Sequence, residues 1–278
     1  MEAQTSIARH YGDGTDVERR VEEESRASGF VSGKKLSPRD VAELDQFHVW
    51  GPEATEELAR LLAPSPGTHV LDIGSGLGGP ARYLAAEFGC CVSGIDLTAA
   101  YCRLASLLSE RMGLQGYVEF RQGDAQQLPF SDNSFDAVWT QHTSMNVADK
   151  AKFYKEIARV LKPGGRFVMY DVTQYTEGPI FLPVPWARHS DSSHLATADE
   201  MREAILRAGF SLVAWNDVSK IALSRLGKMI AKSKTSGFPR LGLHLLMGAE
   251  FSEMIRNLHA NLEQRRCAVM QGLFARVE

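Results

Sequence analysis

The sequence predicts an α/β protein with a doubly wound, mostly parallel sheet. Short apolar segments alternate along the chain with amphipathic segments that repeat apolar residues every three to four positions. The first apolar segment runs directly into a glycine-rich turn. The 278 residues are 44% hydrophobic and 23% charged, which is typical of a globular chain and excludes a disordered one.

Two helices are expected ahead of the sheet. The first begins at Pro38, and the second repeats apolar residues at helical spacing between 54 and 62 before Pro64 ends it. The residues before Pro38 are mostly polar and charged. We therefore expect residues 1–66 to form an N-terminal helical cap.

The alternation of strands and helices occupies residues 67–219, which we expect to form the core. Six strands are expected there, at residues 69–74, 91–96, 118–124, 135–141, 166–172 and 211–218. Helices between them end at glycines such as Gly89 and Gly113, because glycine readily takes the left-handed conformation that follows a helix. Strands that alternate with amphipathic helices indicate parallel pairing with helices on both faces.

Two segments depart from this alternation. Residues 173–196 contain several prolines and aromatic residues, which is typical of a long binding loop or lid. Residues 220–266 have the pattern of a helical insert, and 267–277 that of a last strand, so 220–278 is expected to form the third part of the chain. The apolar stripes of the insert would suit a homodimer interface.

Composition and charge weigh against several classes of function. The chain has 31 basic and 34 acidic residues and lacks the basic excess of a dedicated nucleic-acid binder. No apolar run approaches the roughly 18 residues needed to cross a membrane, and no secretory signal is expected. The four cysteines form no CxxC pair, which favours a reduced, cytoplasmic protein. No set of potential ligands has metal-binding spacing, so no metal is expected.

The glycine-rich turn reads DIGSGLGG at residues 72–79. Glycines let the backbone turn tightly and approach a ligand with no Cβ in the way, while the first helical N–H groups face that ligand. Asp96 ends the second strand, where a carboxylate can accept both hydroxyls of an adenosine ribose. The spacing Gly74-x-Gly76-x-Gly78 differs from the G-x-G-x-x-G pattern of NAD-binding folds, which disfavours an NAD-dependent oxidoreductase.

The D-x-G-x-G-x-G form that begins at Asp72 resembles that of the class I S-adenosylmethionine-dependent methyltransferases. Segments at 123–125 (GDA), 135–146 (FDAVWTQHTSMN) and 161–172 (LKPGGRFVMYDV) resemble the same family in the same order. The resemblance covers about residues 50–218. It implies a Rossmann-like, seven-stranded sheet with an antiparallel last strand, and S-adenosylmethionine as the cofactor. It also implies that the cofactor-binding residues are Asp72, Gly74, Ser75, Gly76, Asp96, Leu97, Gly123, Asp124, Ala125 and Gln141.

A finer resemblance concerns the acceptor of the methyl group. The segments HVWG at 48–51 and QHTSMN at 141–146, with the late helical insert, are similar to those of the sarcosine/dimethylglycine N-methyltransferases and related small-molecule methyltransferases. This implies a small-molecule partner that accepts the methyl group on nitrogen, as an amine or amino-acid-like compound. Transfer to oxygen or carbon of a specialised metabolite is the alternative. A module that binds a ligand without catalysis is a third interpretation.

His142 follows the fourth strand, at the edge where open α/β sheets bind ligands. We predict it as the catalytic residue, because a neutral imidazole can take a proton from the acceptor or orient it. The alternative is a histidine that only hydrogen-bonds the loop, and for His48 ordinary packing is favoured. The residues expected to contact the acceptor are Tyr11, Trp50, Asn146, Trp186 and His189.

Overall fold

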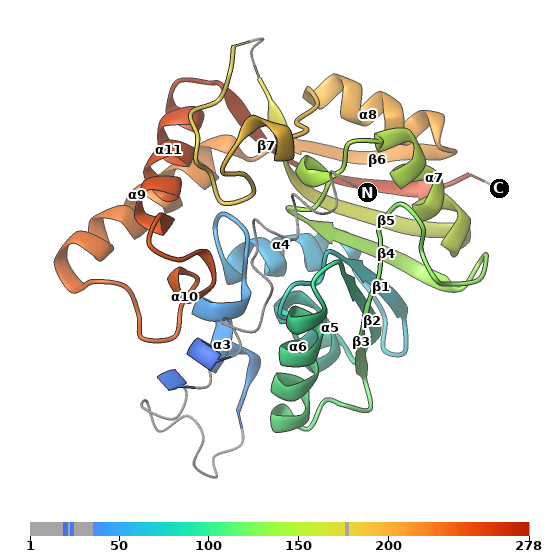
Figure 1. Cartoon of the computed structure of the whole chain (residues 1–278). Helices are drawn as coiled ribbons and strands as arrows, with labels where there is room; N and C mark the ends of the chain where they lie inside the picture. The colour runs from blue at the N-terminus through green and yellow to red at the C-terminus, as the bar shows by residue number, and fades with distance from the viewer. Residues whose placement is uncertain (1–18, 22, 25–35, 176–177, 278) are drawn as a thin grey trace.

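Seven strands form one sheet in the computed structural model, which describes residues 19–21, 23–24, 36–175 and 178–277 (Figure 1). The strands are β1 (His69–Ile73), β2 (Cys91–Asp96), β3 (Val118–Gln122), β4 (Phe135–Gln141), β5 (Leu161–Gln174), β6 (Phe210–Asp217) and β7 (Cys267–Arg276). Their order across the sheet is β3-β2-β1-β4-β5-β7-β6. Neighbours pair in parallel except β7, which runs antiparallel to both β5 and β6. The predicted doubly wound, mostly parallel α/β sheet with an antiparallel last strand is confirmed.

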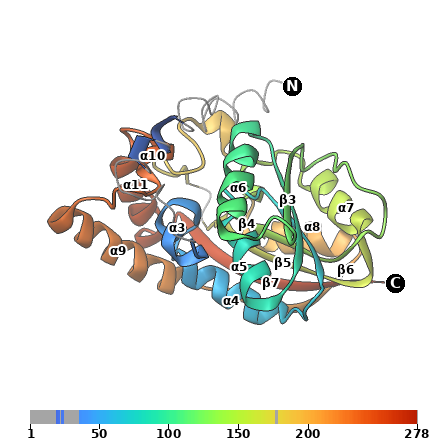
Figure 2. The ribbon, with the colours of Figure 1, turned by 90° about the horizontal axis from the view of Figure 1, so that it is seen from below.

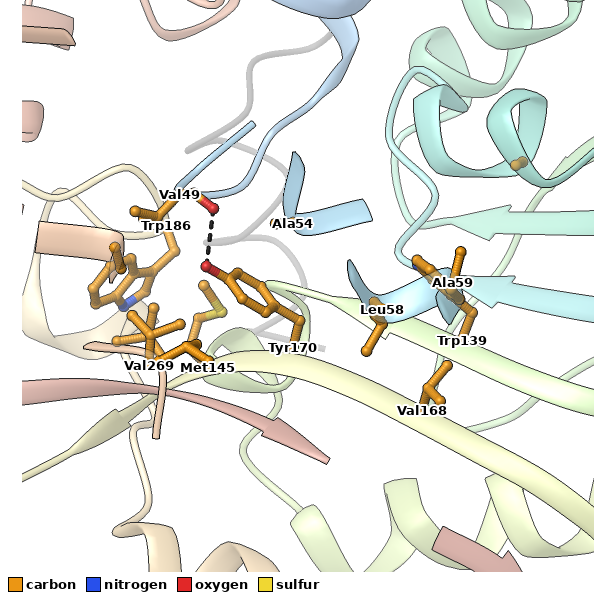
Figure 3. Packing of buried hydrophobic residues seen from close by; sticks show 14 of the residues in the cluster. Val49, Ala54, Leu58, Ala59, Trp139, Met145, Val168, Tyr170, Trp186 and Val269 are labelled. Carbon is orange, nitrogen blue, oxygen red and sulfur yellow. Dashed lines mark hydrogen bonds between the residues drawn. The ribbon is translucent and has the colours of Figure 1, made fainter. Parts of the chain in front are cut away.

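Helices pack on both faces of this sheet. They are α3 (Pro38–Asp45), α4 (Pro52–Leu62), α5 (Gly79–Phe88), α6 (Ala99–Met112), α7 (Lys150–Val160), α8 (Ala198–Arg207), α9 (Ser219–Ser236), α10 (His244–Met247) and α11 (Phe251–Glu263). Successive strand residues point to opposite faces, so on β1 Val70 packs in the cluster of α4 and α5, while Leu71 packs in that of α7 and α8. Figure 3 shows the first cluster, where Leu58 of α4 lies near Trp139 and Val168 of the sheet.

A buried ion pair fixes α3 to the core. The Arg82 guanidinium of α5 donates to the Asp45 carboxylate over 2.6 Å, and both side chains are at most 1% exposed. Further guanidinium bonds reach the carbonyl oxygens of Leu77 and Ala105. Burial raises the pKa of Asp45 to about 6, although the charge of Arg82 opposes this shift. The end of α3 is therefore held against the helix that follows the glycine-rich turn.

The predicted helical insert before the last strand consists of three helices. α9, α10 and α11 form one end of the molecule in both views (Figures 1 and 2). The helices of the insert are interrupted at Gly237 and Gly248, whose φ angles of 70° and 77° favour glycine because it has no Cβ. α10 lies beside α3, where the Leu243 N–H donates to the Glu43 carbonyl over 3.1 Å. The insert and the cap thus meet next to the same end of the strands.

Several boundaries differ from the sequence prediction. β5 begins at Leu161, five residues early, because Leu161 pairs with Phe135 ahead of an irregularity in the ladder. β5 also extends to Gln174, and β3 ends at Gln122. α3, which begins at Pro38 as predicted, ends at Asp45, and Phe47 and His48 lie in the turn that follows it.

The three-part division of the chain stays a prediction. α3 and α4 precede the sheet, as expected of a cap over residues 1–66. β7, which comes from residues 220–278, lies between β5 and β6 and therefore completes the sheet of residues 67–219. The last part is thus continuous with the core rather than separate from it.

Candidate active site

A large cavity opens at the carboxyl ends of β1, β2 and β4, the edge at which open parallel sheets bind ligands. It encloses about 1040 Å³, counted out to its open mouth. Phe47 from the turn after α3, Pro185 from the β5–α8 loop (175–197) and Met247 from α10 complete its wall. The sequence-predicted residues that line it are Gly74, Gly76, Asp96, Leu97, Gly123, Asp124, Ala125, Gln141, His142, Asn146 and Trp186.

The turn between β1 and α5 is packed tightly on two sides. Gly74 and Gly76 have φ angles of 77° and 52°, a region that favours glycine. A Cβ on Gly76 would lie 2.9 Å from the ring of Phe47, and a Cβ on Gly74 would overlap the side chain of Thr143. The turn therefore presents bare backbone to the cavity between the cap and the loop after β4.

Asp96 fixes this turn from the end of β2. One carboxylate oxygen accepts a hydrogen bond from the Gly76 N–H over 2.9 Å, and the other accepts one from the Thr98 N–H over 2.8 Å. Burial raises the pKa of Asp96, while these backbone hydrogen bonds lower it. Each oxygen keeps lone-pair capacity for a further donor. The residue can thus hold the turn and a ligand's hydroxyl groups together.

Two residues of the predicted cofactor-binding set do not line the cavity. Asp72 is 2% exposed and Ser75 is 4% exposed. Burial, with the negative charge of Asp96, raises the pKa of Asp72 to about 8. Asp72 Oδ2 and Ser75 Oγ have no hydrogen-bond partner within the described residues. Buried polar atoms without partners are rare in folded proteins and mark places where water or a ligand completes the network.

The segment after β3 forms a firm turn on the cavity wall. The Asp124 carboxylate accepts a hydrogen bond from the Gln126 N–H over 2.8 Å. A Cβ on Gly123 would overlap the side chain of Ile95, so the backbone runs directly against β2. This turn brings the predicted residues Gly123, Asp124 and Ala125 to the same cavity as Asp96.

His142 begins the loop after β4 with a φ of 51°, which is uncommon outside glycine. Its ring stacks on that of Tyr170, with centroids 5.3 Å apart and 13° between the planes. Its Nε2 is buried and has no partner in the described part of the chain. Burial and the neighbouring His48 lower the pKa of His142 well below 6.5. The imidazole is therefore neutral at pH 7.

Asp171 on β5 holds the loop that positions His142. Its carboxylate accepts hydrogen bonds from the backbone N–H groups of Thr143 over 3.0 Å and Ser144 over 3.2 Å. Burial raises the pKa of Asp171 to about 6, while the bonds from Ser144 and the charge of Lys150 oppose that shift. The sequence motif contains Asp171, but its spacing does not reveal this contact.

Lys150 joins the same loop to the β5–α8 loop. Its ammonium group donates to the carbonyl oxygens of Ser144, Val147 and His194, at 2.6, 2.6 and 2.7 Å. Burial lowers the pKa of Lys150 to about 8, and the charge of Asp171 opposes that effect. Three acceptors match the three donors of an ammonium group, so Lys150 acts as a structural tie.

Asn146 also anchors the β5–α8 loop. Its amide nitrogen donates to the carbonyl oxygens of Trp186 over 2.8 Å and Ser192 over 3.0 Å. The Trp186 indole N–H in turn donates to Ser193 Oγ over 3.0 Å. Figure 3 shows Trp186 buried close to Met145, beneath the turn that carries Val49. Asn146 lines the cavity, but its amide nitrogen is engaged in holding this loop.

Two predicted acceptor contacts, His189 and Trp50, are not among the described residues that line the cavity, and a third is not described. His189 is exposed on the β5–α8 loop. Trp50 is partly buried against the core with a φ of 79° and is not one of the lining residues. Tyr11 lies outside the described residues. The predicted roles of His189 and Trp50 depended on sequence proximity to the site, which does not determine where a side chain points.

A polar cluster behind Gln141 was not predicted. The Thr55 hydroxyl lies 2.7 Å from Gln46 Oε1, 3.0 Å from His48 Nε2 and 3.2 Å from Gln141 Oε1. His48 Nε2 carries a hydrogen, because its other neighbour is the Gly51 carbonyl oxygen at 2.9 Å, which can only accept. Burial lowers the pKa of His48 to about 4. His48 is thus packed, as expected, and it also hydrogen-bonds Thr55, whose hydroxyl contacts the cavity residue Gln141.

Metal-binding clusters and membrane-spanning helices are both absent from the described residues. No three histidine, cysteine, aspartate or glutamate side chains gather there in a way that could hold a metal ion. None of the helices in this part of the chain is long and apolar enough to cross a membrane.

Comparisons with known proteins agree with this geometry. A family profile described as "Methyltransferase domain" matches residues 71–169. Methyltransferase GfsG from Streptomyces halstedii is 32% identical over 191 residues, which are 65% of this chain and 66% of that protein. The chain belongs to the S-adenosylmethionine-dependent methyltransferases. The family predicted from the D-x-G-x-G-x-G turn is confirmed.

Other relatives of this methyltransferase differ in the atom they methylate. A glycine/sarcosine/dimethylglycine N-methyltransferase from Actinopolyspora halophila is 30% identical over 206 residues, 66% of this chain and 36% of that protein. Sterol 24-C-methyltransferase ERG6B from Gibberella zeae is 40% identical over 114 residues, 41% of this chain and 30% of that protein. Further relatives are named O-methyltransferases. The chain thus spans from about a third to about two thirds of the length of these first relatives.

Solved structures share the fold of this methyltransferase at low sequence identity. A Haemonchus contortus phosphoethanolamine N-methyltransferase superposes with a TM-score of 0.75 at 18% identity, over 100% of this chain and 61% of the other. A geranyl diphosphate methyltransferase gives 0.72 at 19% identity over the full length of both chains. The [4+2]-cyclase SpnF gives 0.66 at 23% identity, over 81% of this chain and 80% of the other. These likenesses establish the fold alone.

Proposed function

We propose that this chain transfers a methyl group from S-adenosylmethionine to a small-molecule acceptor bound beside His142. One observation carries the proposal: a single cavity joins two unlike halves. The cofactor half contains the glycine turn, Asp96 and Asp124, and the acceptor half consists of Phe47, Met145, Val147, Pro185, Trp186 and Met247, with His142 and Asn146 as its polar members. Large pockets with a few convergent polar groups are the usual sites of small-molecule chemistry.

The residues of the cofactor half fit S-adenosylmethionine. Asp96 has lone pairs left for ribose hydroxyls, and the turn at Gly74 and Gly76 presents backbone without a Cβ to the cavity. The Gln141 amide nitrogen is buried without a partner in the described structure, so a donor is available at the end of β4. Bound S-adenosylmethionine supplies an electrophilic methyl group on a sulfonium centre. The chain's own task is then to place an acceptor in line with that group.

His142 would contribute a neutral imidazole that accepts a proton from the acceptor or orients it. Its lowered pKa keeps it unprotonated at pH 7, as a base requires. Stacking on Tyr170 and the Asp171 contacts to the following residues restrict its position. Trp186, held by Asn146, would help to exclude water from the reacting atoms.

The acceptor atom is a finer proposal. Transfer to nitrogen is supported by the N-methyltransferases among the relatives, and transfer to oxygen or carbon by the others. The amino-acid-like acceptor expected from the sequence would need a cation for its carboxylate, and no lysine or arginine lines the described cavity wall. A homodimer and a cytoplasmic location likewise stay predictions from the sequence.

The test is to incubate the protein with methyl-labelled S-adenosylmethionine and a metabolite extract, and to identify the labelled product. Calorimetric titration with S-adenosylhomocysteine and with NAD is run in parallel. Binding of S-adenosylhomocysteine, no binding of NAD and transfer to a small molecule would support the proposal. Tight binding of S-adenosylhomocysteine without transfer to any compound would favour the non-catalytic module instead.

A further inference from the structure

We infer that the acceptor is an uncharged, mainly apolar molecule with one polar group placed at His142. The inference rests on the proposed function and specifies the substrate class of the same site. It follows from the side chains that line the acceptor half and from the partners of the basic residues around it. It departs from the amino-acid-like acceptor that the sequence motifs suggest.

Among the residues that the structure describes, no charged side chain lines the acceptor half. Six of its eight residues are apolar, and Trp186 is 1% exposed. The two polar members are Asn146, whose amide nitrogen is committed to two carbonyl oxygens, and His142. His142 is neutral at pH 7, because burial and His48 lower its pKa. In the part of this half that the structure describes, an acceptor therefore meets mainly apolar surface and one neutral imidazole.

Two basic residues of the described chain near this half, Lys150 and Arg188, are engaged elsewhere. The ammonium group of Lys150 is enclosed by three carbonyl oxygens at 2.6 to 2.7 Å. The guanidinium of Arg188, two residues after the cavity residue Trp186, bonds Glu250 over 2.6 Å and the Met247 carbonyl over 3.1 Å. A carboxylate or diphosphate on the acceptor would have to displace these bonds to find a counter-charge.

The charges that do line the cavity act against an anionic acceptor. Asp96 and Asp124 both belong to the cofactor half, and both are carboxylates. Burying an ion without a partner is costly, whereas each methylene buried on an apolar wall tightens binding about fourfold. The described wall of the acceptor half likewise offers a protonated amine no carboxylate. A neutral molecule with an apolar body is the chemistry that this half accommodates.

The test compares two probes that share one apolar tail. The protein is saturated with S-adenosylhomocysteine, which first shows that the cofactor half is functional. Geraniol, geranyl diphosphate and sarcosine are then titrated by calorimetry. We expect geraniol to bind at least about 10- to 100-fold more tightly than geranyl diphosphate, the cost of one unsatisfied buried polar or charged group, and sarcosine to show no binding.

A charge placed in the wall gives a second readout. Met247→Lys adds a cation to the acceptor half and should reduce the preference for geraniol over geranyl diphosphate by at least about tenfold. Leu212→Lys, on the outer strand β6 and 44% exposed, adds the same charge outside the cavity and should keep the wild-type preference.

The outcomes separate this inference from the proposed function. Failure to bind S-adenosylhomocysteine would overturn the proposed function, whatever the probes do. Intact binding of S-adenosylhomocysteine, together with tighter binding of geranyl diphosphate or sarcosine than of geraniol, would overturn the neutral acceptor alone. Intact cofactor binding with no affinity for geraniol would also count against it, because an apolar cavity should retain an apolar alcohol. A Met247→Lys variant that does not bind S-adenosylhomocysteine leaves the wild-type comparison to decide.

Discussion

Replacing Asp96 tests the cofactor half most directly, because its carboxylate serves the fold and the ligand at once. It accepts the Gly76 N–H over 2.9 Å and the Thr98 N–H over 2.8 Å. In the proposed function it also accepts two ribose hydroxyls. Asp96→Ala removes all of these acceptors together, without adding bulk to the turn.

The expected magnitudes follow from these bonds. A hydrogen bond to a charged group contributes about 1.5–3 kcal/mol net. Burial raises the pKa of Asp96 and so weakens the benefit of its charge, which favours the lower end of the range. Two lost backbone bonds would then lower the free energy of unfolding by about 3 kcal/mol. Two lost ribose bonds would weaken S-adenosylhomocysteine binding on the order of 100-fold.

The assay separates the two roles of Asp96. Thermal unfolding measures the structural cost, and calorimetry measures affinity for S-adenosylhomocysteine, adenosine and 2′,3′-dideoxyadenosine. Wild type should prefer adenosine over the dideoxy compound, and Asp96→Ala should bind both equally. Glu87→Ala, which removes an exposed carboxylate from the far end of α5, is the matched control and should leave both measurements unchanged.

The reasoning is refuted if Asp96→Ala still distinguishes adenosine from its dideoxy analogue. Asp96→Asn covers the case in which the alanine variant unfolds. It retains one acceptor oxygen, so it should fold better than Asp96→Ala and show a smaller preference for adenosine than wild type. A preference equal to that of wild type would show that the carboxylate does not hold the ribose.

Three other predictions address the turn, the catalytic residue and the buried acid. Gly76→Val should abolish S-adenosylhomocysteine binding in calorimetry, because its Cβ would press on Phe47 at a φ of 52°, whereas Gly116→Val, with open space around it, should bind normally. His142→Ala should lower kcat about 10²- to 10⁴-fold if His142 is a base, while the affinity for S-adenosylhomocysteine stays within about twofold. Because the pKa of His142 lies well below 6.5, wild-type activity should stay level through pH 6.5 and fall only in more acidic buffer. An unchanged kcat in the variant would show that His142 takes no part in the chemistry. Asp72 keeps its proton in the folded state up to about pH 8 but loses it near pH 4 in the unfolded state, so the stability of the fold decreases as the pH rises between these values. Asp72→Asn should therefore raise the Tm of the ligand-free protein more at pH 8 than at pH 5. An equal rise in Tm at both pH values would contradict the raised pKa of the buried Asp72 carboxyl.

Sequence patterns predicted residues of the proposed cofactor half that do line the cavity, because the determinants of these residues are local. Gly74, Gly76 and Asp96 are required by a tight turn and a strand end, and both features are visible within a few residues. The acceptor half was harder to predict, since Phe47 and Met247 reach it from opposite parts of the chain. Their apolar types fit a helix face as well as a cavity wall, so no local pattern marks them.

The side chains that hold the loop of His142 in place could not be predicted from the sequence either. Asp171 and Lys150 act through backbone groups of the loop after β4, and backbone partners leave no trace in residue types. The exposed position of His189 shows the converse, because a histidine in a loop rich in aromatic residues need not face the site. The backbone path of the β5–α8 loop, which Asn146 helps to hold, determines which side chains of that loop face the cavity.

The buried pair of Arg82 and Asp45 limits how the cap can be exchanged between related proteins. A chimera that takes its cap from a relative without an acid at position 45 would leave the guanidinium of Arg82 buried in the core without an ion-pair partner. Breaking a buried ion pair on one side typically costs about 3–5 kcal/mol, a large share of a domain's stability. Because Phe47, two residues further along, lines the cavity, anyone who grafts caps to change acceptor preference must transfer or redesign residues 45 and 82 as a unit.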